Sequence, residues 1–245
     1  MSRAILITGA TGKQGGAVIN ALLAKSSSEF LLLAVTRNKE SASAKNLAAK
    51  SSNIKLVEGD LDSIPALFQA AKRAAGTVPI WGVYSVQLSM GKGVTLEGEV
   101  RQGKGPTAFM ENLEPIFATK IFLTMIRDTL KDKPLQWVAI EDIGYFAAEA
   151  FTDTRGWNKK AISITGDELT FAQLSEAFEH ATGGPAGTTF GILGKALKVG
   201  VKELGIMVNW FRDEGYGADL AKVRQLNPEA KTMEQWVKTS AFVSH

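Results

Sequence analysis

Apolar runs alternate with helix-period segments along the first 87 residues of the chain. The apolar runs predict strands at residues 4–9, 30–36, 54–60 and 80–87, and the segments between them predict helices at 13–25, 41–50 and 63–76. A short, nearly continuous apolar run is typical of a parallel strand that is covered on both faces. Because strands alternate with helices, we expect an α/β fold built on a doubly wound parallel sheet.

The second half of the chain has a less regular pattern. Residues 135–142 and 161–166 predict two further strands, and Glu141 and Asp142 suit the first turn of the helix between them, where acids are favourable. The alternation breaks between these halves. At residues 99–107 a polar segment that should open a helix meets Gly-Lys-Gly-Pro, and an apolar piece follows with no strand before it.

A glycine triplet lies between the first predicted strand and the first predicted helix, spaced as G-x-x-G-x-x-G. In a dinucleotide-binding turn, the first glycine permits the tight turn, the second lets backbone approach a pyrophosphate, and the third allows close packing of the helix. The helix N-terminus offers N–H groups and a positive dipole end to the phosphates. We therefore expect a dinucleotide site that includes Gly9, Thr11, Gly12, Lys13, Gln14 and Gly15. The alternative is a glycine-rich turn kept for packing.

The end of the second predicted strand indicates which cofactor is preferred. NAD-binding versions usually place an acid there to hold the ribose hydroxyls. This chain has Thr-Arg-Asn-Lys at 36–39 and no acid until Glu40. Arg37 can make a forked contact to a 2′-phosphate, and Lys39 and Lys13 can add charge, which favours NADP(H) over NAD. The alternative for Arg37 is a solvated turn residue.

Two further strand ends supply candidate contacts. Asp60 and Leu61 follow the third predicted strand, where the adenine would lie. Asp60 is either a polar contact to the base or a helix-start residue. Ser85, Val86 and Gln87 end the fourth predicted strand, beside the expected path of the nicotinamide.

These residues resemble a known family, the NmrA-like proteins, an atypical branch of the short-chain dehydrogenase/reductase superfamily. The resemblance rests on "GATGKQGG", "VTRN", "VEGDLDS" and "GVYSVQ", and on the later segments "AFMENLEP", "LQWVAIEDIGYFAAEAF", "ITGDELTFAQLSEAFEHATG" and "VRQLNPEAKTMEQWV". It implies a Rossmann-type sheet with a smaller, mostly helical second domain. Residues 1–104 and 135–166 would form the dinucleotide-binding domain, and 105–134 and 167–245 a discontinuous substrate or lid domain.

One family feature is missing at the break noted above. The family has a strand, a helix and another strand before its F-x-E-N segment, whereas here Gly105 follows Lys104 directly. We therefore expect a sheet short of one or two strands, with an internal deletion near Lys104-Gly105. The deletion is natural, a splice or gene-model product, or engineered. Loss of central strands should expose apolar sheet surface unless another strand or subunit covers it.

The missing segment also affects which catalytic residues the chain can have. Superfamily enzymes use a Tyr-x-x-x-Lys pair for proton transfer. The residues four places after Tyr84, Tyr145 and Tyr216 are leucine, glutamate and leucine, so the chain has no such pair. The remaining candidates for a proton donor are Lys92 and Lys104, and the alternative for each is a solvated loop lysine.

Family analogy adds a cleft and a lid. Phe109 and Asn112, from the F-x-E-N segment, would line the substrate cleft, with a helix-start cap as the alternative for Asn112. Thr170 and Gln173 form a capping box for a helix that ends at Gly183. The glycine-interrupted segment that follows is rich in Met, Trp and Phe. It suits a mobile lid or a partner surface, or the packing of a small satellite domain.

Composition adds few constraints. Hydrophobic residues make up 45% and charged residues 22% of 245, which suits one α/β domain with a small satellite. The 28 Lys and Arg against 25 Asp and Glu are dispersed, so neither nucleic acid nor a membrane is an expected partner. The chain has no cysteine, and we expect no metal site. The first residues do not form a signal peptide, and we expect a cytoplasmic protein, with a nuclear location open.

Three functional interpretations remain. The first is an NADP(H)-binding regulator that senses the redox state of its cofactor and passes it to a protein partner, without Tyr-Lys catalysis. The second is an NADPH-dependent reductase or biosynthetic enzyme that acts on a small carbonyl or enone substrate. The third is a truncated isoform with impaired function. A homodimer also stays open.

Overall fold

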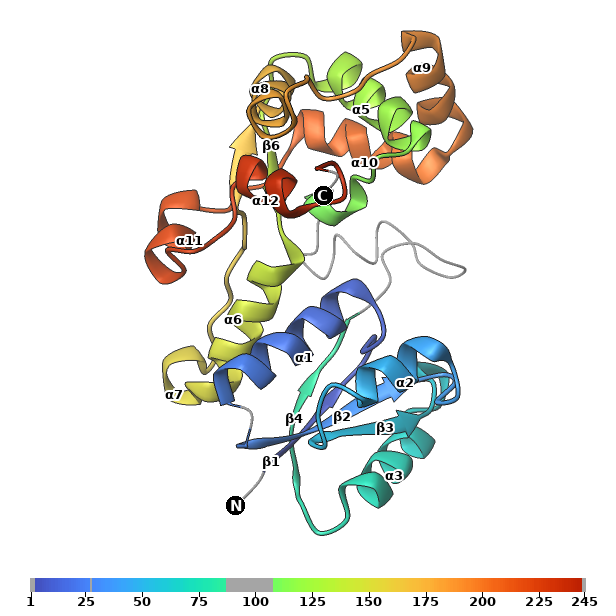
Figure 1. Cartoon of the computed structure of the whole chain (residues 1–245), viewed down its shortest axis with the longest axis vertical. Coiled ribbons are helices and arrows are strands. Elements are labelled where there is room, and N and C mark those ends of the chain that lie inside the picture. Colours follow the sequence, from blue (N-terminus) through green and yellow to red (C-terminus); the bar gives the residue numbers. More distant parts are fainter. Residues whose placement is uncertain (1–2, 27, 87–107, 244–245) are drawn as a thin grey trace. The chain divides into compact units, whose positions relative to one another are not determined.

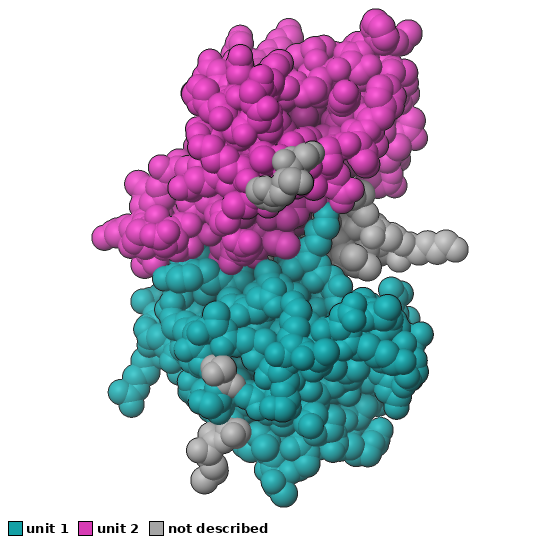
Figure 2. Space-filling model, in the orientation of Figure 1, with its two compact units in different colours: residues 1–88, 143–161 teal, residues 89–142, 162–245 magenta. Residues whose placement is uncertain are grey.

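The protein forms two compact units in a computed structural model, which describes residues 3–26, 28–86 and 108–243. Unit 1 comprises Met1–Leu88 and Ile143–Ala161, and unit 2, the longer in residues, comprises Ser89–Asp142 and Ile162–His245 (Figure 2). The division falls inside helix α6 (Ile140–Thr152). Among the described residues, the sequence-based domain bounds differ from this division at 135–142 and 162–166, which belong to unit 2.

Unit 1 is built on a four-stranded parallel sheet with the order β3-β2-β1-β4 (Figure 1). Its elements are β1 (Arg3–Ile7), α1 (Lys13–Ser26), β2 (Phe30–Thr36), α2 (Ala42–Ala48), β3 (Ile54–Glu58), the 3-10 turn η1 (Leu61–Ser63), α3 (Ile64–Ala75), β4 (Ile80–Tyr84), most of α6, and α7 (Thr154–Trp157). The predicted helices and strands of this half are confirmed, with shifts of a few residues at their ends.

Both faces of this sheet are covered. Along β1, Ile5 and Ile7 face α1, α2 and α6, whereas Ala4 and Leu6 face α3. All four side chains are at most 1% exposed. The continuous apolar run of β1 follows from this, because a strand between two helical layers has no solvent face. The α/β, Rossmann-type, doubly wound fold class is confirmed.

Unit 2 combines a three-stranded sheet with helices. Its sheet has the order β5-β6-β7, with β5 parallel and β7 antiparallel to β6. The elements are β5 (Ala108–Phe109), the 3-10 turn η2 (Met110–Asn112), α5 (Phe117–Leu130), β6 (Leu135–Val138), β7 (Asp167–Leu169), α8 (Phe171–Thr182), α9 (Gly191–Gly200), α10 (Lys202–Asp213), α11 (Leu220–Leu226) and α12 (Met233–Thr239). One large apolar cluster joins α5, β6, α8, α10 and α12.

The ends of α8 match the sequence pattern. Thr170 accepts a hydrogen bond from the backbone N–H of Gln173, and Gln173 accepts one from that of Thr170, so the capping box is confirmed. Gly183 closes the helix with φ +80°, which glycine adopts at little cost.

One strand prediction is wrong. Residues 161–166 are not a strand, and the strand lies at Asp167–Leu169 instead. The segment before it is fixed by other bonds: the Thr165 hydroxyl donates to the carbonyl oxygens of Trp137 and Asp167. Gly166 lies so close to Lys231 that a Cβ there would be 2.2 Å from the Lys231 carbonyl oxygen. An apolar pattern cannot report such contacts with distant residues.

Candidate dinucleotide site

The carboxyl ends of the four parallel strands in unit 1 meet at one edge of the sheet. Ile7 is in register with both Ala34 and Tyr84, and Thr36 is in register with Glu58. The segments that leave these strands therefore lie along one line, as in open α/β sheets that bind ligands there. The structure brings these predicted residues to this edge: Gly9, Thr11, Gly12, Arg37, Asp60, Leu61, Ser85 and Val86.

The glycine loop forms a tight turn between β1 and α1. Gly9 has φ +60°, and the Gly12 N–H donates to the Gly9 carbonyl at 2.9 Å. A Cβ at Gly15 would lie 2.3 Å from the Gly9 carbonyl oxygen and 2.9 Å from the Ala10 Cα. Gly15 thus allows the first turn of α1 to pack on the loop itself. A larger residue at Gly9 or Gly15 would strain this turn.

The N-terminus of α1 is open to solvent. Thr11, Gly12 and Lys13 are exposed, Gln14 is half-buried and Gly15 is buried. The positive end of the helix dipole and the first backbone N–H groups therefore face outward, as an anion site requires. This geometry suits the phosphate-binding role that the sequence predicts for the loop.

Thr8 is a residue that the sequence analysis missed. Its side chain is 3% exposed, and its hydroxyl accepts a hydrogen bond from the Val86 N–H at 2.9 Å. The Thr8 N–H donates to the Tyr84 carbonyl at 3.0 Å. Thr8 therefore ties the start of the glycine loop to the segment after β4. A polar residue between an apolar run and a glycine was the available signal, but its partner lies 78 residues away.

The loop after β2 leaves Arg37 accessible. The Thr36 hydroxyl accepts from the Asn38 N–H at 3.2 Å, which holds the loop in a local turn. Arg37 is exposed and has no hydrogen-bond or ion-pair partner within the part of the chain that the structure describes. Glu40, the first acid after β2, pairs with Lys45 at 3.0 Å. The guanidinium of Arg37 is thus available to a ligand.

Glu58 is a second residue that the sequence analysis missed. It is the last residue of β3, and its carboxylate accepts a hydrogen bond from the Lys39 backbone N–H at 3.2 Å. An acid therefore stands beside the loop after β2, although it comes from the neighbouring strand. It holds the loop backbone through this bond, whereas the acid of an NAD site binds the ribose hydroxyls.

Asp60 starts the turn η1. Its carboxylate accepts from the Asp62 N–H at 3.1 Å, so the helix-start interpretation is confirmed. Leu61, next to it, is 42% exposed. Contact of either residue with an adenine stays a prediction. Gln87, Lys92 and Lys104 lie outside the described residues.

Neither tyrosine of unit 1 has the lowered pKa that is typical of an acid–base tyrosine. Burial raises the pKa of the Tyr84 phenol above its ordinary value. Burial also raises the pKa of Tyr145, and the nearby Glu149 raises it further. An acid–base tyrosine needs a pKa lowered toward neutrality, usually by a cation. The direction here is the opposite for both groups.

The F-x-E-N segment of unit 2 is partly structural. Glu111 accepts hydrogen bonds from the Ile140 N–H at 3.1 Å and the Trp236 indole N–H at 3.0 Å. Asn112 is exposed and ends η2. The cap alternative for Asn112 is wrong, because α5 begins after Ile116 without a side-chain cap. A role for Phe109 or Asn112 in a cleft stays a prediction.

Asp142 lies in the first turn of α6, as the sequence predicts. Its burial has no sign in the sequence, and it is 3% exposed. Its carboxylate accepts from the Asn227 amide at 3.1 Å and the Lys231 N–H at 3.2 Å. Burial raises the pKa of Asp142 to about 6, although the hydrogen bond from the Lys231 N–H acts in the other direction. Asp142 therefore holds the segment between α11 and α12 against the start of α6.

The described residues also bear on metal binding and on membrane insertion. Across residues 3–26, 28–86 and 108–243, no group of three or more His, Cys, Asp or Glu side chains is placed to hold a metal ion. The helices in those ranges include none that is long and apolar enough to cross a membrane.

The fold and the loop geometry define a Rossmann-type protein with an NAD(P)-binding fold. The sequence model of the NmrA-like family matches residues 1–104 and 105–242, and the chain belongs to this family. The two matched segments meet between Lys104 and Gly105. The break in the sequence pattern is thus also where the family match is divided.

Solved structures of low sequence identity share the fold. NmrA, a negative transcriptional regulator solved with NADP, has a TM-score of 0.61 at 18% identity, covering 97% of this chain and 94% of that one. Citrobacter sp. triphenylmethane reductase with NADP(H) has a TM-score of 0.63 at 17% identity, covering 96% and 99%. An NADPH-dependent quinone oxidoreductase from Escherichia coli, solved with NADPH, has a TM-score of 0.58 at 19% identity, covering 96% and 99%.

Proposed function

We propose that the protein binds NADP(H) and acts as a redox-sensing regulator that has no Tyr-Lys catalysis. The observation that carries the proposal is the combination at one sheet edge of an intact glycine loop and an unpaired Arg37. The loop supports pyrophosphate binding, and Arg37 supports recognition of a 2′-phosphate. The sequence contains no Tyr-x-x-x-Lys pair that could transfer a proton once the cofactor is bound.

The remaining contacts follow from the order of the strand ends. Gly9, Gly12 and the start of α1 would hold the pyrophosphate, with Arg37 and Lys39 on the 2′-phosphate. Asp60 and Leu61 would border the adenine. Ser85 and Val86 would border the nicotinamide path, where Thr8 fixes the Val86 backbone. NADP or NADPH in the three solved structures named above supports this preference, although a further NmrA structure holds NAD.

A cofactor titration tests the proposal. NADPH, NADP and NADH are titrated by calorimetry into the full chain and into Arg37→Ala. We expect NADPH to bind more tightly than NADH. The Arg37→Ala variant should lose about 10- to 100-fold in NADPH affinity, because a charge-assisted contact is worth about 1.5–3 kcal/mol. NADH affinity should change little.

Arg73→Ala is the matched control, because Arg73 is an exposed arginine in the last turn of α3. It should leave both affinities unchanged. No saturable binding of any of the three nucleotides would overturn the cofactor proposal. Tighter binding of NADH than of NADPH would overturn the assignment of Arg37.

The reductase remains the second candidate. Its support is the fold shared with a triphenylmethane reductase and a quinone oxidoreductase. The full chain is incubated with NADPH and a panel of quinone, carbonyl and enone substrates, and absorbance at the NADPH band is followed. Turnover above the rate without protein would reject the regulator that lacks catalysis. A regulator should show none, and its protein partner should bind differently with NADPH and with NADP.

A further inference from the structure

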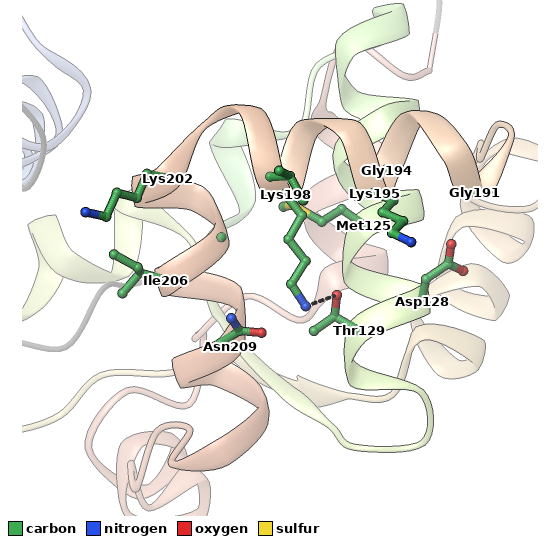
Figure 3. Close-up of a pocket in the computed structure, with 12 residues that line it drawn as sticks. Met125, Asp128, Thr129, Gly191, Gly194, Lys195, Lys198, Lys202, Ile206 and Asn209 are labelled. Carbon is green, nitrogen blue, oxygen red and sulfur yellow. Dashed lines mark hydrogen bonds between the residues drawn. The ribbon is translucent and has the colours of Figure 1, made fainter.

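A cavity of about 640 Å³ opens between α5, α9 and α10 of unit 2 (Figure 3). Its volume lies in the range of small-molecule sites, roughly 300–1,000 Å³. Its lining side chains come from these three helices and from no part of unit 1. The cavity is therefore separate from the residues that the proposed cofactor site uses.

Two buried glycines let the helices that line the cavity approach each other closely. A Cβ at Gly194 would lie 2.9 Å from the Met125 backbone nitrogen, so α9 touches α5 there. A Cβ at Gly205 would lie 2.3 Å from the Lys198 carbonyl oxygen, so α10 touches the end of α9. Backbone meets backbone at both points.

The polar side of the cavity is cationic. Lys195, Lys198 and Lys202 line it, and none of them forms an ion pair within the described parts of the chain. Lys198 extends from α9 between the helices, and its ammonium donates to the Thr129 hydroxyl at 3.3 Å (Figure 3). Asp128, an acid that lines the cavity, already pairs with Arg127 at 2.8 Å. The cavity thus carries an excess of positive charge.

A second acid lies within electrostatic reach of this lysine. The pKa of Asp213 is held below its ordinary value, first by Arg212 and to a smaller extent by Lys133 and Lys198. Asp213 hydrogen-bonds to Arg212 at 2.7 Å and does not line the cavity. Its charge is offset by Arg212, so the ammonium of Lys198 remains uncompensated.

The rest of the lining is mostly apolar. Met125, Val199 and Ile206 supply hydrocarbon surface, and Thr129 and Asn209 add hydroxyl and amide groups. An apolar pocket with a few convergent polar groups is the usual form of a small-molecule site. An inorganic anion would leave this hydrocarbon surface unused, and an uncharged lipid would leave the lysines unpaired.

We propose that this cavity binds a small carboxylic acid with an apolar body, of the size of a medium-chain fatty acid or an aryl acid. The carboxylate meets Lys198, with Lys195 at the rim, and the apolar body lies against Met125 and Ile206. A charge-assisted hydrogen bond from Lys198 replaces its single bond to Thr129. The site is independent of the proposed function, because it uses neither the glycine loop nor the cofactor.

The test uses sodium octanoate as probe and 1-octanol as its uncharged match. Each is titrated calorimetrically into the full chain, at octanoate concentrations below self-association. We expect saturable binding of octanoate and at least tenfold weaker binding of octanol. Lys198→Met, which keeps most of the side-chain length but removes the charge, should weaken octanoate binding at least tenfold. Lys222→Met, at an exposed lysine of α11, is the matched control and should bind as the wild type does.

A second pair of variants tests the apolar part without changing charge. Ile206→Trp fills the cavity and should abolish octanoate binding, whereas Ala196→Trp, at an exposed position of α9 outside the lining, should not. Circular dichroism checks that each variant is folded, and Lys198→Met decides the question if Ile206→Trp is not. Absence of saturable binding, or equal binding by Lys198→Met and wild type, would overturn the proposal. The chain is also mixed with phosphatidylglycerol vesicles. Binding to these vesicles without binding of octanoate would also overturn the proposal.

Discussion

The two edge strands of the unit 1 sheet differ in their exposed residues. β3 exposes Lys55 and Glu58, both charged. β4 exposes Trp81 at 39% and Val83 at 47%, both apolar. Charged side chains are a common way to protect a sheet edge from pairing with another chain. β3 therefore has the composition of a natural edge, whereas β4 has the composition of an interior strand.

This difference is what the expected loss of a strand near Lys104-Gly105 would leave on β4. A strand that pairs with another strand on both sides needs no charged residues to protect it. The apolar Val83 and Trp81 are what such a strand would carry. The family match is divided at the same point. The glycine loop leaves the carboxyl end of β1, between the ends of β2 and β4. Within the described residues, β4 ends the sheet and the glycine loop is intact.

The largest expected effect compares two residues in register on one face of the sheet. Leu6 of β1 pairs with Val83 of β4, and Leu6 is 1% exposed. Leu6→Ala should lower the free energy of unfolding by about 2–5 kcal/mol, because it leaves a cavity. Val83→Ala should cost less than about 1 kcal/mol, because 47% of its surface is already exposed. Urea denaturation measures both. Equal costs would mean that β4 is covered in solution.

A charged group buried in unit 2 gives the second effect. Asp142 has an ordinary pKa of 3.8 and a folded value of about 6. The folded state therefore binds more protons between these values, and its stability falls as pH rises from about 4 to 7. At 1.36 kcal/mol per pKa unit, the loss is up to about 3 kcal/mol. Urea denaturation from pH 4 to 7 measures this slope.

Asp142→Asn should remove most of that slope, since its side chain does not titrate. Asp213→Asn is the control: Asp213 has a lowered pKa, so its contribution to stability is lost as pH falls, below this window. A wild-type slope that Asp142→Asn does not change would show that Asp142 titrates normally. Asp142 in unit 2 would then no longer serve as a buried charge to compare with the exposed apolar residues of β4.

Trp81 should show an intermediate effect, because its ring is only partly exposed. It stacks on Phe30 at 6.1 Å, meets Phe151 at 6.2 Å and lies 4.3 Å from the Arg3 guanidinium. Trp81→Ala should cost about 1–2 kcal/mol, more than Val83→Ala but less than Leu6→Ala. A double-mutant cycle with Arg3→Gln should give a coupling of about 0.5–1 kcal/mol. A coupling of zero would show that the contact between Arg3 and Trp81 does not stabilise β4.

The smallest expected change in stability comes from placing a charged residue on β4 and an apolar residue on β3. Val83→Lys and Lys55→Val should each change the free energy of unfolding by less than about 0.5 kcal/mol, because both positions are exposed. Self-association should respond in opposite directions. Sedimentation velocity should show less association for Val83→Lys and more for Lys55→Val. Greater association of Val83→Lys would contradict the assignment of β4 as the uncovered edge.

Much of unit 1 could be predicted from sequence, because its signals are local. Apolar runs gave the strands within a few residues, and the glycine spacing gave the turn whose Gly9 has positive φ. The position of the break also agrees with the family match. The misses share a cause. Thr8, Glu58 and Asp142 each bond to residues from other elements, so no window around them contains the partner.

The sequence by itself determined the strand–helix order, the glycine loop, the absence of an acid directly after β2 and the absence of a Tyr-x-x-x-Lys pair. Each depends on neighbours within a few residues. Only the tertiary structure decided that Val83 is exposed, that Asp142 is buried and that three helices of unit 2 enclose a cationic cavity. Burial depends on what packs against a residue, and the amide that holds Asp142 lies 85 residues away along the chain.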